Sequence, residues 1–167
     1  EASSNLARFD GVRYGHRAEN CPDTLTMYLQ SRSEGFGPEV KLRIMLGTYA
    51  LSADAYADFY QKAQKVRRLI ADDFAHSFSQ CDCLLLPTTS DLPPLLGQEL
   101  EPRESYTADL CTVSANLAGL PALSLPSGMS EEGLPVGLQL VGNHFQEETL
   151  LKVAWTLEQC VGQVEVK

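Results

Sequence analysis

SRSEGFGPEVKLRIMLGTYALS, residues 31–52, joins a glycine-rich loop to a helix and decides how the first part of the chain folds. Pro38 suits the first turn of this helix, and Glu39 is favourable beside its positive end. Arg43 falls close to the apolar side of the helix, so we expect it to need an anionic partner or ligand, because an unpaired buried charge is costly. That apolar side is predicted to consist of Val40, Ile44 and Leu51, with Met45 as an extension.

The rest of the chain alternates helical and strand patterns, which predicts an α/β fold with helices layered on a sheet. We expect helices at 23–33, 53–80, 105–119 and 147–160, and strands at 83–87, 122–126 and 136–142. The unbroken apolar run at 83–87 is typical of a buried strand in a parallel or mixed sheet. Residues 90–102 predict a surface loop, which can instead cover a pocket or meet a partner subunit.

The helix expected at 53–80 has the clearest pattern, because its apolar residues step by three or four and it contains neither Gly nor Pro. We expect it to pack on the sheet through Phe59, Ala63, Val66, Ile70, Phe74 and Phe78. The helix at 23–33 is expected to follow an N-cap at Asp23 or Thr24 and to bury Leu25, Tyr28 and Leu29. The helix at 105–119 is expected to start at Ser105 or Thr107 and to end at Gly119.

The chain has 167 residues, of which 44% are hydrophobic, enough for one domain or one large piece of a domain. It begins at Glu1 rather than Met and lacks the pattern of a signal peptide, so we interpret residues 1–167 as a single piece of a longer protein. No apolar run approaches the ~20 residues that span a bilayer. Five cysteines at irregular spacings fit free thiols in a reducing cytoplasm and predict no metal site.

The formal net charge of −9 argues against this segment as the main contact for nucleic acid, which needs clustered Lys and Arg. Basic residues do gather at 62–68, but acidic residues flank them, which favours a solvated helix face. Three arginines and a histidine lie between Arg8 and Arg17. They can meet an anion or form unrelated ion pairs.

Several runs of sequence carry a resemblance to a known family. They are SSNLARFDGVRYG (3–15), the stretch 31–52, LLLPTT (84–89), NLAGLPALSLP (116–126) and GLPVGLQLVG (133–142). The three downstream runs resemble blocks shared across the amidase signature family, and the two upstream runs narrow the resemblance to its glutaminase-type amidotransferase subunits. The resemblance covers nearly the whole chain but only the C-terminal part of the family's sequence, so it implies the C-terminal part of the amidase signature fold.

The family hydrolyses amides with a Ser–Ser–Lys arrangement set in Gly- and Ser-rich sequence, where the Lys relays protons and backbone N–H groups hold the oxyanion. The serine pairs of this chain, Ser3-Ser4 and Ser31-Arg-Ser33, have no such surroundings, and the nearest lysine, Lys41, is an ordinary helix residue. The resemblance therefore implies that no catalytic residue lies in this chain. We expect the piece to be inactive alone.

Glutamine must be held by its α-carboxylate and its α-ammonium so that its side-chain amide meets the nucleophile. The carboxylate demands an Arg, and the ammonium demands an acidic group. The resemblance implies that Arg43 and Asp109 fill these two substrate-binding roles. Asp109 comes early in its expected helix, so it can instead serve only the helix dipole. Leu42 departs from the family, which often has a second basic residue before the Arg.

The resemblance also implies partners. The full protein would release ammonia from glutamine or asparagine and pass it to a partner subunit, which would use ATP and Mg²⁺ to convert Glu-tRNA(Gln) to Gln-tRNA(Gln). A small third subunit would brace the complex. This chain has no phosphate-binding glycine motif, so we expect no cofactor in it and assign ATP and most tRNA contacts to the partner. Two alternatives remain, a free-standing amidase of the same family and a non-catalytic module that acts through a protein interface.

Overall fold

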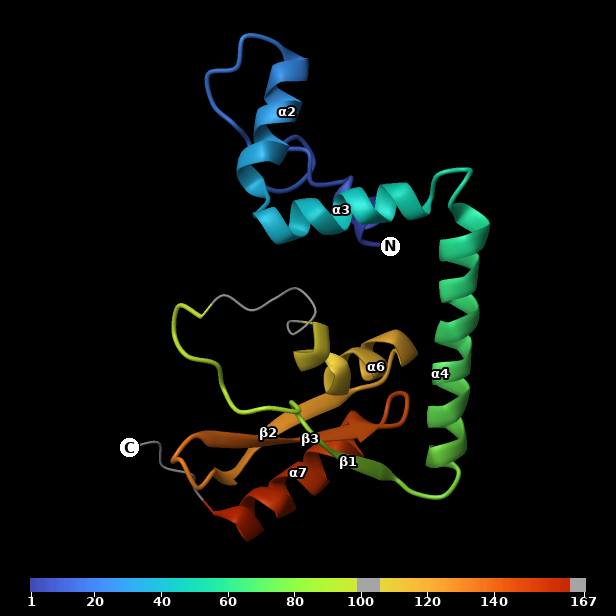
Figure 1. Ribbon diagram of the computed structural model, residues 1–167, viewed down its shortest axis with the longest axis vertical. Coiled ribbons are helices and arrows are strands. Elements are labelled where there is room, and N and C mark those ends of the chain that lie inside the picture. The colour runs from blue at the N-terminus through green and yellow to red at the C-terminus, as the bar shows by residue number, and fades with distance from the viewer. Residues whose placement is uncertain (99–105, 163–167) are drawn as a thin grey trace. The chain divides into compact units, whose positions relative to one another are not determined.

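The computed structural model describes residues 1–98 and 106–162 (Figure 1). The chain divides into two compact units, Glu1–Gln64 and Lys65–Lys167. Over the described residues, no helix combines the length and the apolar character needed to cross a membrane.

The first unit is helical. Its elements are α1 (Ala2–Leu6), α2 (Thr24–Gly35), α3 (Pro38–Ala50) and a π-helix, η1 (Tyr56–Gln61). The N-cap predicted for α2 is confirmed, since the Asp23 carboxylate accepts a hydrogen bond of 2.9 Å from the Thr26 N–H. The predicted inward face is wrong, because the buried residues of α2 are Met27 and Ser31, whereas Leu25 and Leu29 are exposed.

The reason is the loop that precedes α2. Ser31 Oγ accepts a 3.0 Å hydrogen bond from the Ala18 N–H, so the helix turns this side toward the loop. Gly11 lies against the same hydroxyl at φ +80°, and a Cβ there would come within 2.7 Å of Ser31 Oγ. The loop and α2 therefore meet at a position that only glycine fits.

Helix α3 starts as the sequence predicts, with Pro38 in its first turn and Glu39 close behind. It packs against α1, a helix that the sequence did not predict. The two approach closely at Gly47, where a Cβ would lie 2.8 Å from Ser3 Oγ. No residue of α3 is fully buried, so the buried surface that we expected beside Arg43 is not formed by the described residues.

The helix predicted at 53–80 is found as η1 followed by α4 (Lys62–Phe78). None of the α4 residues is buried, and the prediction that its apolar stripe packs on the sheet is wrong for the described residues. The strands of the second unit are instead covered by α7 (Glu147–Val161). Within this unit, α4 donates a 2.7 Å hydrogen bond from Arg67 Nε to the Leu117 carbonyl.

The sheet of the second unit contains β1 (Cys83–Pro87), β2 (Ala122–Met129) and β3 (Pro135–Gly142) in the order β1-β3-β2. Both strand pairs are antiparallel, with Leu85 opposite Leu140 and Leu123 opposite Leu140 on the other side. The expectation of parallel pairing is therefore wrong for these strands. For β2 and β3 the physical reason is their connection, which has only five residues, too few for the crossover that parallel strands need.

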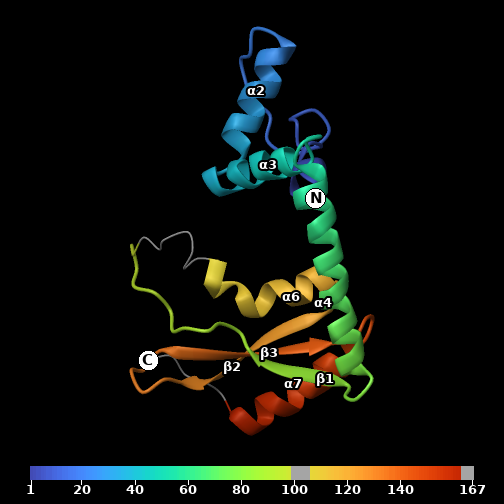
Figure 2. The same ribbon diagram turned by 45° about the vertical axis from the view of Figure 1, so that its right-hand side comes forward.

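Helices cover both faces of this sheet, which confirms the predicted α/β layering. Figure 2 shows α7 on one face and α6 (Leu110–Ala118) on the other. Gly119 ends α6 in the left-handed conformation, at φ 73°, as the sequence predicts. The core between α7 and the sheet consists of Leu140, Leu150 and Ala154, with Cys83, Leu123, Leu125 and Leu157 packed around them.

Two predicted features lie partly outside the described residues. The loop expected at 90–102 is exposed and has no helix or strand over 90–98, and its remaining residues lie outside the described ranges. The helix expected from Ser105 or Thr107 is found as a helical turn at 106–108 followed by α6, while Ser105 itself is not described. Asp109 thereby becomes the residue at the start of α6.

Candidate functional site

Arg43 lies in α3, and its side chain is 54% exposed. Its Nε donates a 2.8 Å hydrogen bond to Oε1 of Glu39, one helical turn earlier. The anionic partner that the sequence led us to expect is thus supplied by the same helix. Within the described residues the terminal nitrogens of Arg43 bind no other group, so the planar fork remains open to a carboxylate.

Asp109 occupies the N-cap position of α6. Its carbonyl oxygen accepts hydrogen bonds from the N–H groups of Thr112 (3.1 Å) and Val113 (2.9 Å), which ties its backbone to the first turn. Its carboxylate makes no capping hydrogen bond, and the residue is exposed. The carboxylate is therefore open to a cationic ligand, and it also lies where the helix dipole favours negative charge.

Arg43 belongs to the first unit and Asp109 to the second. Each has a group of the type that the family resemblance implied, in the described structure a guanidinium with unbound terminal nitrogens and a carboxylate that makes no capping hydrogen bond. It stays a prediction that both side chains bind the same amino acid, as a clamp on its carboxylate and ammonium groups.

Gln139, which was not predicted as a functional residue, lies in β3 within the run GLQLVG. It is 4% exposed, and its Nε2 donates a 2.8 Å hydrogen bond to the carbonyl oxygen of Cys111 in α6. The signal in the sequence was a polar residue between Leu138 and Leu140. A buried side-chain amide needs a hydrogen-bond partner, so it predicts a contact with a neighbouring element. Gln139 therefore links the central strand to the start of the helix that follows Asp109.

The same sheet face carries a pair of hydroxyls. Thr88 Oγ1 and Ser124 Oγ lie 2.9 Å apart, and Ser124 stands opposite Gln139 in the strand pairing. Gly137 leaves room for them, since a Cβ there would lie 3.0 Å from Thr88 Oγ1. This face is thus more polar than the face under α7, which is lined by leucines.

The two serine pairs that were considered as nucleophiles lie in surroundings that suit a structural role. Ser3 Oγ is buried without a hydrogen-bond partner in the described structure, and Ser31 Oγ holds the Ala18 N–H. Throughout 1–98 and 106–162, no hydrogen bond joins either pair to a lysine. A nucleophile needs an adjacent base, so neither pair has the geometry of an activated hydroxyl.

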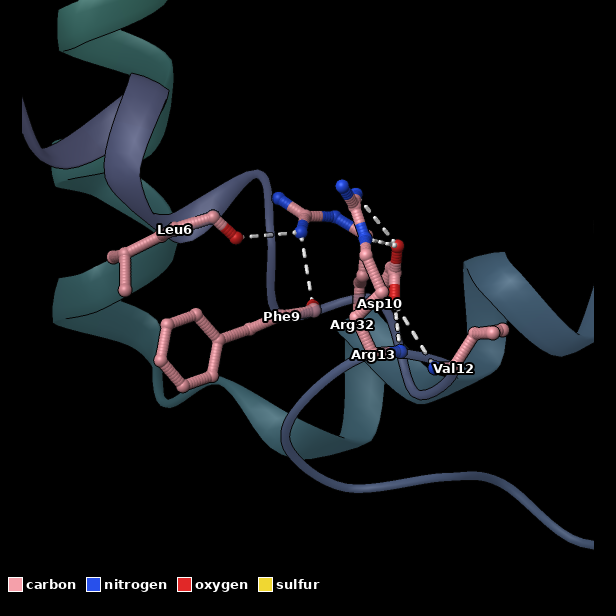
Figure 3. A network of polar contacts seen from close by, with 6 residues as sticks. All are labelled: Leu6, Phe9, Asp10, Val12, Arg13 and Arg32. Atoms are coloured by element: carbon pink, nitrogen blue, oxygen red, sulfur yellow. Dashed lines mark hydrogen bonds and ion pairs between the residues drawn. The ribbon is translucent and has the colours of Figure 1, made fainter.

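A second constellation of polar groups lies in the loop Arg8–Gly15 and is drawn in Figure 3. Oδ1 of Asp10 accepts hydrogen bonds from the N–H groups of Val12 (2.9 Å) and Arg13 (3.0 Å), and Oδ2 accepts from Arg13 Nη2 (2.9 Å). Arg32 Nη1 reaches the same loop and donates to the carbonyls of Leu6 (2.9 Å) and Phe9 (3.1 Å). The network stabilises the turn before α2.

Two of the basic residues between Arg8 and Arg17 bind groups of the chain itself. Arg13 pairs with Asp10, and His16 Nε2 lies 2.7 Å from Glu34 Oε2. Of the two possibilities left open by the sequence, an anion site or unrelated ion pairs, the structure supports internal contacts for these two residues, an ion pair for Arg13 and a hydrogen bond for His16.

Asp10→Asn is expected to destabilise the protein in a pH-dependent way. The N–H groups of Arg13 and Val12, with the Arg13 guanidinium, lower the pKa of Asp10 from 3.8 to about 2. Because the folded-state pKa is the lower one, the carboxylate stabilises the fold above about pH 4 and loses this effect as the pH falls toward 2. Thermal unfolding of the intact protein should show a lower midpoint for the variant at pH 7.

The difference between wild type and Asp10→Asn should narrow steadily between about pH 4 and the lowest pH at which the protein stays folded. Asp54→Asn is the matched control, since Asp54 is exposed and has no hydrogen-bond partner in the described ranges. A midpoint difference that stays the same from neutral pH into the acid range would show that the Asp10 charge does not stabilise the turn.

Comparison with known proteins supplies the family. The model of the family described as Amidase matches residues 1–151. The A subunit of glutamyl-tRNA(Gln) amidotransferase from Neisseria meningitidis is 53% identical over 158 residues, which is 95% of this chain and 33% of that protein. The corresponding protein of Caldanaerobacter subterraneus is 56% identical over 160 residues, again 95% of this chain and 33% of the relative. The chain thus spans about a third of the length of the curated relatives it matches.

Solved structures of related proteins match the fold of this chain. The A subunit of glutamyl-tRNA(Gln) amidotransferase from Thermotoga maritima matches 86% of this chain and 34% of its own, with a TM-score of 0.62 and 37% identity. A 6-aminohexanoate cyclic dimer hydrolase complexed with substrate matches 75% of this chain and 27% of its own, with a TM-score of 0.55 and 28% identity. The fold is therefore shared by an amidotransferase component and by a hydrolase of another compound.

Proposed function

The chain belongs to the amidase family, and from this premise we propose that it forms the substrate-binding part of a larger protein that releases ammonia from glutamine. The observation that carries the proposal is the identity of 53% and 56% to A subunits of glutamyl-tRNA(Gln) amidotransferase, spread over 95% of the chain. The 6-aminohexanoate cyclic dimer hydrolase, at 28% identity, is more distant. A glutaminase subunit is therefore favoured over an amidase for another substrate.

In the proposed mechanism, Arg43 binds the α-carboxylate of glutamine and Asp109 binds its α-ammonium. Arg43 meets the geometric demand because Glu39 holds Nε and leaves the terminal nitrogens for two parallel hydrogen bonds. Asp109 meets the charge demand because its carboxylate is not used to cap α6. The two contacts fix the substrate backbone, so that the side-chain amide is held at a defined distance from the nucleophile.

The bond-breaking groups belong to another part of the polypeptide in this proposal. A serine there attacks the amide carbon, and a lysine relays the proton through a second serine to the leaving ammonia. The residues of this chain orient the substrate and perform none of these steps. Residues 1–167 alone are therefore expected to release no ammonia above the blank.

The ammonia is passed to a partner subunit that uses ATP and Mg²⁺ to convert Glu-tRNA(Gln) to Gln-tRNA(Gln), within a complex braced by a small third subunit. The net charge of −9 supports this division, since it favours tRNA contacts on the partner. This chain would need no cofactor of its own. The cytoplasm is the proposed location, supported by five cysteines that are all free thiols.

The proposal is tested with the intact protein and its partner subunits. Ammonia released from glutamine and Gln-tRNA(Gln) formed from Glu-tRNA(Gln) are measured in parallel, with ammonium chloride replacing glutamine in a second series. We expect both products with glutamine, and Gln-tRNA(Gln) with ammonium alone. An intact protein that hydrolyses other amides but releases no ammonia from glutamine would instead be a free-standing amidase.

A further inference from the structure

We propose that Gln139 is a positioning residue, which fixes the start of α6 and through it the carboxylate of Asp109 for the substrate's ammonium group. The inference rests on the proposed function, because it explains how one half of the clamp is held in place. It assigns to Gln139 no contact with the substrate.

The backbone of Gln139 is held by strand pairing on both sides. Its strand, β3, is the central strand, and Gln139 is paired with Leu86 of β1 and with Ser124 of β2. Successive side chains of a strand point to opposite faces, so Leu140 enters the core under α7 while Gln139 faces α6. The amide thus extends toward α6 from the most constrained part of the sheet.

The contact on the helix lies in its first turn. Gln139 Nε2 donates to the carbonyl of Cys111, the second residue of α6, at 2.8 Å. The Asp109 carbonyl accepts hydrogen bonds from the N–H groups of Thr112 and Val113 in the same turn. The backbone of Asp109 is therefore connected to the central strand through one turn of helix and one partly buried hydrogen bond.

The other end of α6 is held separately. Arg67 Nε donates to the Leu117 carbonyl at 2.7 Å, and the chain then turns at Gly119. These contacts hold the C-terminal end of α6, whereas the contact of Gln139 holds its first turn. With Gln139 removed, the first turn can move relative to the sheet, and small displacements of a binding group weaken a clamp strongly.

The test compares Gln139→Met with wild type in the intact protein with its partners. Met keeps the volume and the length of the side chain but has no N–H to donate. We expect KM for glutamine to rise about tenfold and kcat to change by less than about threefold, because the variant displaces a binding group and not a reacting one. Amidation driven by ammonium chloride should stay at the wild-type rate.

Two further variants keep the test decisive. Gln139→Glu also lacks the donor, and we expect it to raise KM at least as much, because its carboxylate faces the Cys111 carbonyl. Ser127→Ala is the matched control, since it removes a 3.0 Å hydrogen bond from a side chain to the Val136 carbonyl in the same sheet. It should leave KM for glutamine unchanged.

A double-mutant cycle with Asp109→Asn separates positioning from general stability. If Gln139 acts through the Asp109 carboxylate, Gln139→Met should raise KM by less than about twofold in the Asp109→Asn background. An equal rise in both backgrounds, or a wild-type KM for Gln139→Met and Gln139→Glu, would overturn the inference. Failure of the proposed function is distinct, since wild type would then release no ammonia from glutamine or Asp109→Asn alone would keep a wild-type KM.

Discussion

Arg43→Ala is expected to lower kcat/KM for glutamine by about a hundredfold or more, because it removes two charge-assisted hydrogen bonds worth about 1.5–3 kcal/mol each. Stability should change little. The pair that Arg43 forms with Glu39 joins two exposed side chains, and such pairs contribute roughly 0–1 kcal/mol. The expected loss is therefore one of substrate binding and not of folding.

The measurement is glutamine-dependent ammonia release by the intact protein, beside amidation driven by ammonium chloride, which should be unaffected. Arg43→Lys should recover part of the loss, because an ammonium keeps the charge but not the fork. Arg68→Ala is the control, since Arg68 Nε forms an exposed pair of 2.9 Å with Asp72 at the same helical spacing. Wild-type kinetics for Arg43→Ala would assign Arg43 a purely structural role and favour the free-standing amidase.

Asp109→Asn is expected to raise KM for glutamine by about tenfold to a hundredfold, because it replaces the carboxylate that binds the ammonium by a neutral amide. Asn is as good an N-cap residue as Asp, so α6 should still start at the same place. The substitution therefore removes the charge and keeps the helix. The KM is read from initial rates of ammonia release at varied glutamine concentrations.

The alternative role for Asp109, a charge that serves only the helix dipole, predicts a different result. Such charges contribute roughly 0.3–1 kcal/mol to stability and nothing to KM. Asp23→Asn is the matched control, because Asp23 occupies the N-cap of α2 and its carboxylate is bound to the Thr26 N–H and hydroxyl. If Asp109→Asn behaves like Asp23→Asn, with a small loss of stability and unchanged kinetics, Asp109 stabilises the helix and does not bind the substrate.

Local signals in the sequence predicted local structure well. The Asp23 cap, the Pro38 start of α3 and the Gly119 end of α6 all depend on hydrogen bonds and backbone angles within a few residues. The family resemblance, inferred from runs such as NLAGLPALSLP, is confirmed by the match over residues 1–151. These features could be predicted because each is encoded in one continuous stretch.

Apolar patterns predicted the elements but not their neighbours. The stripe on α4 marks a helix, yet none of its residues is buried in the described structure, and α7 covers the sheet instead. Periodicity says that a face is apolar and does not say which surface will cover it. The run at 83–87 likewise predicted a strand, but only the fold shows that this strand pairs antiparallel with β3.

The sequence by itself determined the family, the residue types of the proposed clamp, and the starts and ends of several helices. The pair of Arg43 with Glu39 is local to α3, and the place of Asp109 early in its helix was expected from the sequence. Only the tertiary structure decided that Gln139 of the central strand holds the first turn of α6. The contact between Gln139 and Cys111 joins residues 28 positions apart. Such a bond forms because the sheet and α6 pack face to face, and their packing depends on the whole unit and not on any single stretch of the chain.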